Sequence, residues 1–141
     1  MSTLDSRKTS PLAEPLGDGL DELIHATIGA AIEVHKNLGP GFTDPLYAQA
    51  LAIELTARSI PFQRDVPVTV TYKGQAIGQA VLAFVINKGL VVDVKTLDLI
   101  LPIHSAQLMA HLKAAGFRVG LLMNFKSPQL RDGIKRVVRN G

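Results

Sequence analysis

The fold of this chain is decided by residues 81–95, which read VLAFVINKGLVVDVK. Two nearly continuous apolar runs, 81–86 and 90–94, surround the polar segment 87–89. This pattern is typical of two buried central strands joined by a three-residue hairpin loop, with Gly89 in the left-handed conformation that such loops usually need. The stretch therefore predicts a β-hairpin at the centre of a sheet.

The second of these strands carries the most site-like pair of residues in the chain, Asp93 and Lys95. Successive side chains of a strand point to opposite faces, so these two share one face. If the hairpin closes Ile86 against Leu90, the register places Asp93 opposite Ala83.

Upstream of the hairpin, apolar residues recur at steps of three and four, which predicts helices. The first starts near Asp18 and ends at Gly39-Pro40, and the second follows Thr43 and stops at Ile60-Pro61. Strict alternation over 66–72 then predicts a half-exposed strand.

Downstream, Pro102 suits a first helical turn, and 103–115 is predicted to be a helix that Gly116 caps. Residues 118–125 are predicted to be another buried strand. After Ser127-Pro128 a short helix and an edge strand both remain open, and the spacing of the apolar residues favours the helix.

These elements predict an α/β fold with a mixed central sheet flanked by helices. With 141 residues, 47% of them hydrophobic, the chain has the size of one domain. We expect a flexible leader over 1–17 and one domain over 18–141.

Composition excludes several functional classes. The chain has no Cys, which rules out disulfides, thiolate metal sites and Cys nucleophiles. Its N-terminal residues lack the apolar core of a signal peptide, and no apolar run reaches the roughly 20 residues that a membrane helix needs. We therefore expect a cytoplasmic protein that does not bind membranes.

The C-terminal segment 126–141 is strongly basic. It holds five basic residues against the single acid Asp132, whereas the whole chain has a net charge of +3. Such a segment suits DNA, RNA or an acidic partner, and a merely solvated surface is the alternative.

The hairpin register gives Asp93 a specific chemical meaning. Two directly opposed carboxylates hold one Mg²⁺ well, and a neighbouring Lys stabilises charge that develops on a phosphate. Ala83 supplies no such carboxylate. A local ion pair between Asp93 and Lys95 is the alternative interpretation.

Several motifs together resemble the GxxExxY proteins of the PD-(D/E)XK nuclease-like superfamily, whose core is also called restriction-endonuclease-like. The similarity covers about residues 20–141. It rests on IEVHK at 32–36, LGPG at 38–41, GFTDPLY at 41–47, DVK at 93–95, HSAQL at 104–108 and GLLMNF at 120–125.

This resemblance implies a metal-dependent phosphodiesterase site. Asp93 stands where the family has Glu, Lys95 and Gln107 are retained, and Asp44 replaces the Glu of the family's name motif. The family's metal-binding Asp falls on Ala83. The implied catalytic residues are therefore Asp93, Lys95 and Gln107, and Asp93 and Asp44 are the implied ligands of a Mg²⁺ that binds weakly or not at all.

Each candidate also has a purely structural interpretation. Asp44, before Pro45, suits a helix N-cap. Gln107 forms a polar stripe with His104 and His111, and such a stripe often only faces water. These two His lie two helical turns apart, too far for one zinc ion.

Three functions follow from these observations. The first is a PD-(D/E)XK nuclease-like protein whose degenerate metal site leaves weak or no activity. The second is a non-catalytic module that binds nucleic acid or a protein on the same fold. The third is a structural or oligomeric module.

Overall fold

The computed structural model describes residues 16–140 with the exception of residue 18. Within this part, the elements follow the predicted order of two helices, antiparallel strands, a helix and a strand. They are α2 (Leu20–Leu38), α3 (Asp44–Ala57), β1 (Phe62–Tyr72), β2 (Gln75–Ile86), β3 (Leu90–Lys95), α4 (Pro102–Ala115), β4 (Val119–Asn124), the short 3₁₀-helix η2 (Leu130–Gly133) and β5 (Ile134–Val138).

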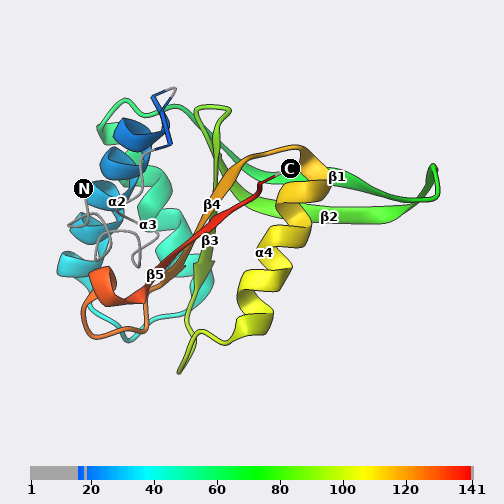
Figure 1. Cartoon of the computed structure of the whole chain (residues 1–141). Coiled ribbons are helices and arrows are strands. Elements are labelled where there is room, and N and C mark those ends of the chain that lie inside the picture. Colours follow the sequence, from blue (N-terminus) through cyan, green and yellow to red (C-terminus); the bar gives the residue numbers. More distant parts are fainter. Residues whose placement is uncertain (1–15, 18, 141) are drawn as a thin grey trace, which may run out of the picture.

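The five strands form one mixed sheet in the order β1-β2-β3-β4-β5 (Figure 1). Strands β3 and β4 are parallel, whereas all other neighbours are antiparallel. Helix α4 is the crossover that parallel neighbours require. The predicted α/β fold with a mixed sheet is therefore confirmed.

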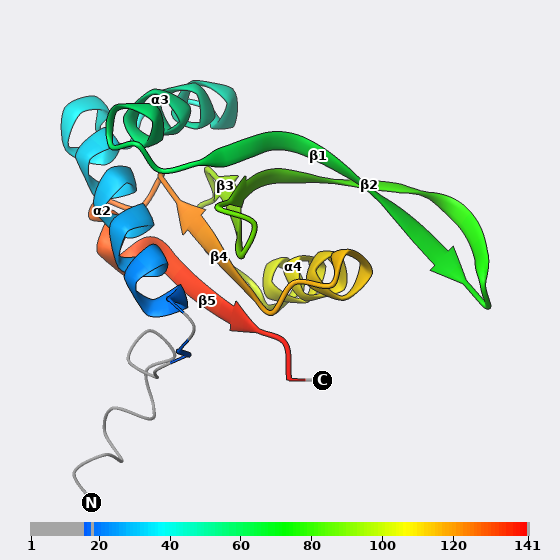
Figure 2. The same cartoon turned by 90° about the horizontal axis from the view of Figure 1, so that it is seen from above.

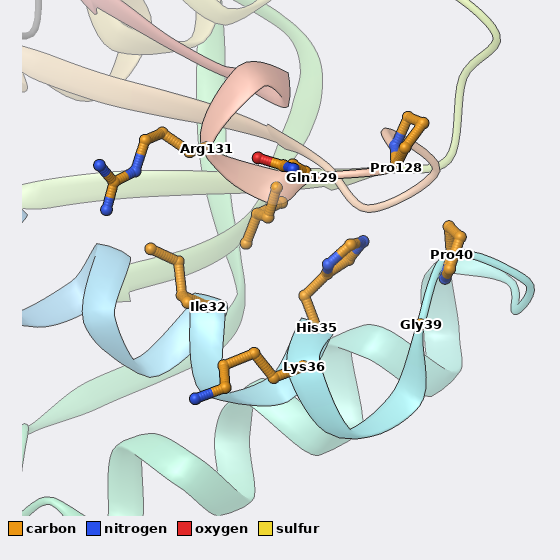
Figure 3. A pocket seen from close by; sticks show the side chains of 9 residues that line it. Ile32, His35, Lys36, Gly39, Pro40, Pro128, Gln129 and Arg131 are labelled. Carbon is orange, nitrogen blue, oxygen red and sulfur yellow. The ribbon is translucent and has the colours of Figure 1, made fainter.

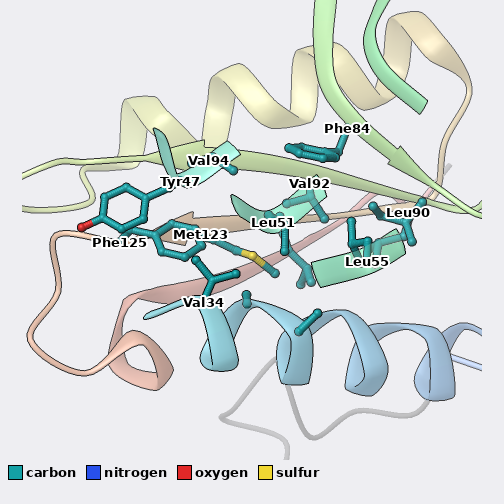
Figure 4. Close-up of a cluster of buried hydrophobic side chains, with 14 of the residues drawn as sticks. Val34, Tyr47, Leu51, Leu55, Phe84, Leu90, Val92, Val94, Met123 and Phe125 are labelled. Atoms are coloured by element: carbon teal, nitrogen blue, oxygen red, sulfur yellow. The ribbon is translucent and has the colours of Figure 1, made fainter. Parts of the chain in front are cut away.

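Helices cover both faces of the sheet, with α2 and α3 on one face and α4 on the other (Figure 2). A larger core lies between the sheet and α2 and α3, where Tyr47, Leu51 and Phe125 are fully buried (Figure 4). A smaller core lies under α4, where Leu108 packs directly over Gly120. Strand β3 lies between these two cores and contributes residues to both.

The hairpin register predicted from the sequence is confirmed, because Ile86 pairs with Leu90 and Phe84 with Val92. The predicted conformation of Gly89 in this loop is wrong. The left-handed residues are Asn87 and Lys88, with φ of 45° and 60°, and not Gly89. A Cβ at Gly89 would make only ordinary van der Waals contact with the side chain of Leu20, at 3.4 Å.

Strands β1 and β2 extend beyond the rest of the fold as an arm (Figures 1 and 2). Every residue from 71 to 79 is exposed. At the base of the arm the side chains of β2 switch sides of the sheet. Phe84 and Leu82 are two positions apart and would normally share a face, but Phe84 packs in the larger core and Leu82 in the smaller one. Asp65, with φ of 53°, lies at this change of face.

The C-terminal segment differs from the favoured helix. Residues 130–133 form only a single 3₁₀ turn, and Ile134–Val138 is an edge strand against β4. The apolar spacing misleads here because Arg136, a charged residue, is a buried part of this strand with 6% of its surface exposed.

The predicted leader 1–17 lies almost entirely outside the described residues. At its end, the main-chain N–H groups of Leu16 and Gly17 donate hydrogen bonds to the carboxylate of Asp21. Leu16 also packs against the larger core. Among the described residues, no helix is long and apolar enough to cross a membrane.

Candidate functional site

Asp93 and Lys95 lie at the carboxyl end of β3, on the face that α4 covers. The Lys95 Nζ is 3.3 Å from Oδ2 of Asp93, so the two side chains do share a face. The side chains are 24% and 26% exposed. An ion pair that is this exposed to water contributes at most about 1 kcal/mol to folding stability, so its effect on the fold is small.

Asp44 reaches the same end of β3 from the other side of the sheet. It is the first residue of α3, with Pro45 following in the first turn and Thr43 in the N-cap position. The Asp44 side chain therefore does not cap its own helix. Instead its Oδ1 accepts a hydrogen bond from the hydroxyl of Thr96, the residue that follows Lys95.

Ala83 lies where β2 leaves β3. The paired positions end at Phe84 and Val92, one step before Ala83 would meet Asp93. The side chain of Ala83 packs against the larger core, whereas Val91, on the same face as Asp93, belongs to the smaller core. This site therefore receives no carboxylate from β2.

Within the described residues, no hydrogen bond or ion pair joins the polar side chains of α4 to the pair on β3. Gln107 is exposed. The Nδ1 of His104 accepts a hydrogen bond of 2.8 Å from the main-chain N–H of Leu101, so this His closes the first turn of its own helix. His111 lies half-buried further along α4.

The donor set falls short of what a divalent metal requires. Mg²⁺ takes about six oxygen ligands in near-octahedral geometry. In the part of the chain that the structure describes, no group of three or more acidic or His side chains is placed to hold a metal ion. The two carboxylates of Asp93 and Asp44 also have partners, Lys95 and Thr96. The residues present do not fit a tightly held Mg²⁺.

Two residues that have no separate signal in the sequence support this end of β3. Asn124 is 5% exposed, and its amide Nδ2 donates to the carbonyl of Leu97 at 2.9 Å while its Oδ1 accepts from the N–H of Leu97 at 2.8 Å. The N–H of Phe125 donates to the carbonyl of Lys95 at 2.8 Å. Both residues lie in the motif 120–125, which gave the only signal for them.

Comparison with known proteins places the chain in a family. A family model described as the PD-(D/E)XK nuclease superfamily matches residues 21–137. This range includes Asp44, Asp93, Lys95 and Gln107. No curated protein and no solved structure matches the chain significantly.

Proposed function

Since the chain belongs to the PD-(D/E)XK nuclease superfamily, we propose that it is a nuclease-like protein of the GxxExxY type with weak or no phosphodiesterase activity. The observation that carries this proposal is the Asp93–Lys95 pair on β3 with no acidic partner from β2. We propose that the missing carboxylate at position 83 is what keeps this site from binding a metal ion.

Lys95 is the residue with the clearest catalytic role in this proposal. Its ammonium group is partly exposed beside Asp93 and is placed to stabilise negative charge on a phosphate. Asp93 orients it, and Asp44, held by Thr96, is the second carboxylate at this end of the sheet. Gln107 would contact the substrate from α4.

Several basic residues of the C-terminal segment are buried or already interact with other parts of the chain. Arg136 is buried, and Nε of Arg139 donates to the carbonyl of Phe117 at 2.8 Å. Lys126 pairs with Asp98. Arg131 and Lys135 are exposed, so we propose that these two, on η2 and β5, make the contacts with phosphate groups.

The decisive experiment restores the missing carboxylate. Ala83→Asp and wild type are compared for Mg²⁺ and Mn²⁺ binding by calorimetry and for cleavage of single- and double-stranded DNA and RNA. Ala76→Asp, at an exposed position of the same strand, is the matched control. We expect cleavage in the Ala83→Asp variant that Lys95→Ala abolishes in that background.

Two results would count against the proposal. Strong cleavage by wild type that persists in Lys95→Ala would show that activity lies elsewhere. No metal binding and no cleavage by a folded Ala83→Asp variant, with folding checked by circular dichroism, would show that more than one ligand is lost.

The alternative is a non-catalytic module on the same fold. The unfit donor set favours it. If the module binds nucleic acid, its affinity falls steeply with salt, because each phosphate contact releases counterions. A flat salt response leaves a protein partner.

The structural or oligomeric function requires self-association, which light scattering tests. The cytoplasmic location also stays a prediction, which cell fractionation tests.

A further inference from the structure

A groove of about 540 Å³ separates the C-terminal end of α2 from the segment that leads into η2 (Figure 3). Side chains from the two segments face each other across it. The lining combines apolar and basic residues and consists of Ile32, His35, Lys36, Gly39, Pro40, Pro128, Gln129, Leu130 and Arg131.

His35 is the most buried polar residue of the lining, with 8% of its surface exposed. Its Nε2 lies 3.2 Å from the main-chain carbonyl oxygen of Phe125. A carbonyl only accepts hydrogen bonds, so Nε2 carries the proton and donates. This bond leaves Nδ1 as the polar atom with which the ring can meet a ligand.

The groove is joined to the candidate site through Phe125. The carbonyl of Phe125 holds His35, and its N–H donates to the carbonyl of Lys95 at 2.8 Å. Because β3 and β4 are parallel, their carboxyl ends lie at the same edge of the sheet. The groove and the Asp93–Lys95 pair therefore lie at the same edge of the sheet, the groove on the face of α2 and the pair on the face of α4.

Two cations border the groove from opposite sides. Lys36 belongs to α2 and Arg131 to η2, and both are exposed. The nearest acids in sequence are Glu33, whose Oε2 accepts a hydrogen bond from Asn37 at 3.0 Å, and Asp132, which is exposed beside Arg131. Neither acid is part of the lining.

The walls between these cations are apolar. Leu130 is 3% exposed and Ile32 is half-buried, and Pro40 and Pro128 close the outer end. A phosphate matches the two cations, and a sugar or base matches the apolar walls. A nucleotide unit has both properties, whereas a simple anion has only one.

We infer that this groove binds one nucleotide of a nucleic-acid strand, with its phosphate between Lys36 and Arg131. The inference rests on the proposed function, because it assumes that the strand then passes the Asp93–Lys95 pair at the same edge of the sheet. The groove is thus a positioning subsite beside the reactive end of β3.

The test uses a minimal strand unit, thymidine 3′,5′-bisphosphate, titrated into the full chain with EDTA present and followed by ¹H–¹⁵N NMR. We expect saturable shifts of the His35 ring nitrogens and of the amides of Lys36 and Arg131. Lys36→Ala and Arg131→Ala should each weaken binding several-fold, because each removes a cation from beside the phosphate.

Lys113→Ala is the matched control, because Lys113 is an exposed Lys in the last turn of α4 as Lys36 is in the last turn of α2. It should leave the affinity unchanged. An equal loss in Lys36→Ala and Lys113→Ala, or no saturable shift at His35, would overturn the inference. Equal affinity for inorganic phosphate would also overturn it, since the apolar walls would then contribute nothing.

Failure of the subsite and failure of the proposed function are distinguishable. The titration needs no metal and no cleavage, so an inactive Ala83→Asp variant would leave saturable binding at His35 intact. Conversely, metal-dependent cleavage that is the same in wild-type and Lys36→Ala backgrounds, together with unshifted His35 signals, would remove only the subsite.

Discussion

The hydroxyl of Thr96 donates a hydrogen bond to Oδ1 of Asp44 and so ties the first turn of α3 to the end of β3. Thr96 directly follows Lys95, and its side chain points to the opposite side of the strand. This hydrogen bond therefore connects α3, which covers one face of the sheet, with the strand end whose Lys95 lies on the other face. The contact fixes the position of Asp44, the second carboxylate at the end of β3.

Replacing Thr96 tests the contact directly. Thr96→Val keeps the shape of the side chain but removes the donor, and hydrogen bonds to charged groups contribute about 1.5–3 kcal/mol. Since Asp44 is half-buried, we expect the lower end of this range in urea unfolding. Thr69→Val, at an exposed position of β1, is the control and should change little. Equal effects of the two variants would contradict the contact.

Tyr47 connects α3 to the end of α2 and to the loop between these helices. Its hydroxyl donates to the carbonyl of Gly39 and accepts from the N–H of Phe42 at 3.1 Å, and its ring stacks on Phe125 at 4.7 Å between centroids. Tyr47→Phe keeps the stack and removes two part-buried hydrogen bonds, each of which contributes about 0.5–1.5 kcal/mol. We expect a loss of about 1–3 kcal/mol of unfolding free energy.

The chain has only two Tyr residues, and the other, Tyr72, is 63% exposed. Tyr72→Phe therefore provides the matched control and should be neutral within about 0.5 kcal/mol. If the two variants unfold at the same urea concentration, the Tyr47 hydroxyl has no structural role.

The loop between β3 and α4 carries a pH-dependent contact. The ammonium of Lys126 hydrogen-bonds Asp98 and attracts its charge, which holds the pKa of this carboxyl below its ordinary value. A lowered folded pKa stabilises the fold above the ordinary pKa, and this contribution is lost as the pH falls through the folded pKa. Carboxyl ¹³C shifts measured against pH should show the lowered value in wild type. An unchanged titration of Asp98 in Lys126→Ala would contradict the pairing.

The sequence predicts the centre of this fold well because its signals there are local. Alternation places Asp93 and Lys95 on one face, and the short loop sets the register of Ile86 against Leu90. These features need only the neighbouring residues. The order of the helices and strands follows from periodicity in the same way.

The remaining features depend on contacts between distant segments. Nothing near Asp44 in the sequence indicates that Thr96 will meet it, because α3 and β3 are brought together by the packing of the larger core. The groove beside His35 arises in the same way, from α2 and η2. Strand β5 is hard to predict from the sequence, because Arg136 places a charge at a buried position and so interrupts the apolar pattern.

Gly133, the last residue of η2, tests how closely this turn must approach the end of β4. A Cβ at this position would lie 2.6 Å from the carbonyl oxygen of Asn124 and 2.7 Å from Cβ of Ser127, closer than real contacts of this kind. Gly133→Ala must therefore displace either η2 or the end of β4, where the Asn124 side chain holds Leu97. Overpacking of this kind typically costs about 1–3 kcal/mol, which urea unfolding would measure.

Gly41→Ala is the control, because a Cβ there would meet no described atom within 4 Å. It should be neutral, or stabilising by a few tenths of a kcal/mol through the lower entropy of the unfolded chain. In ¹H–¹⁵N spectra, Gly133→Ala should shift the side-chain amide of Asn124 and the N–H of Leu97, whereas Gly41→Ala should not. Unshifted Asn124 signals in a destabilised Gly133→Ala variant would show that the strain is absorbed in η2 and does not reach the end of β3.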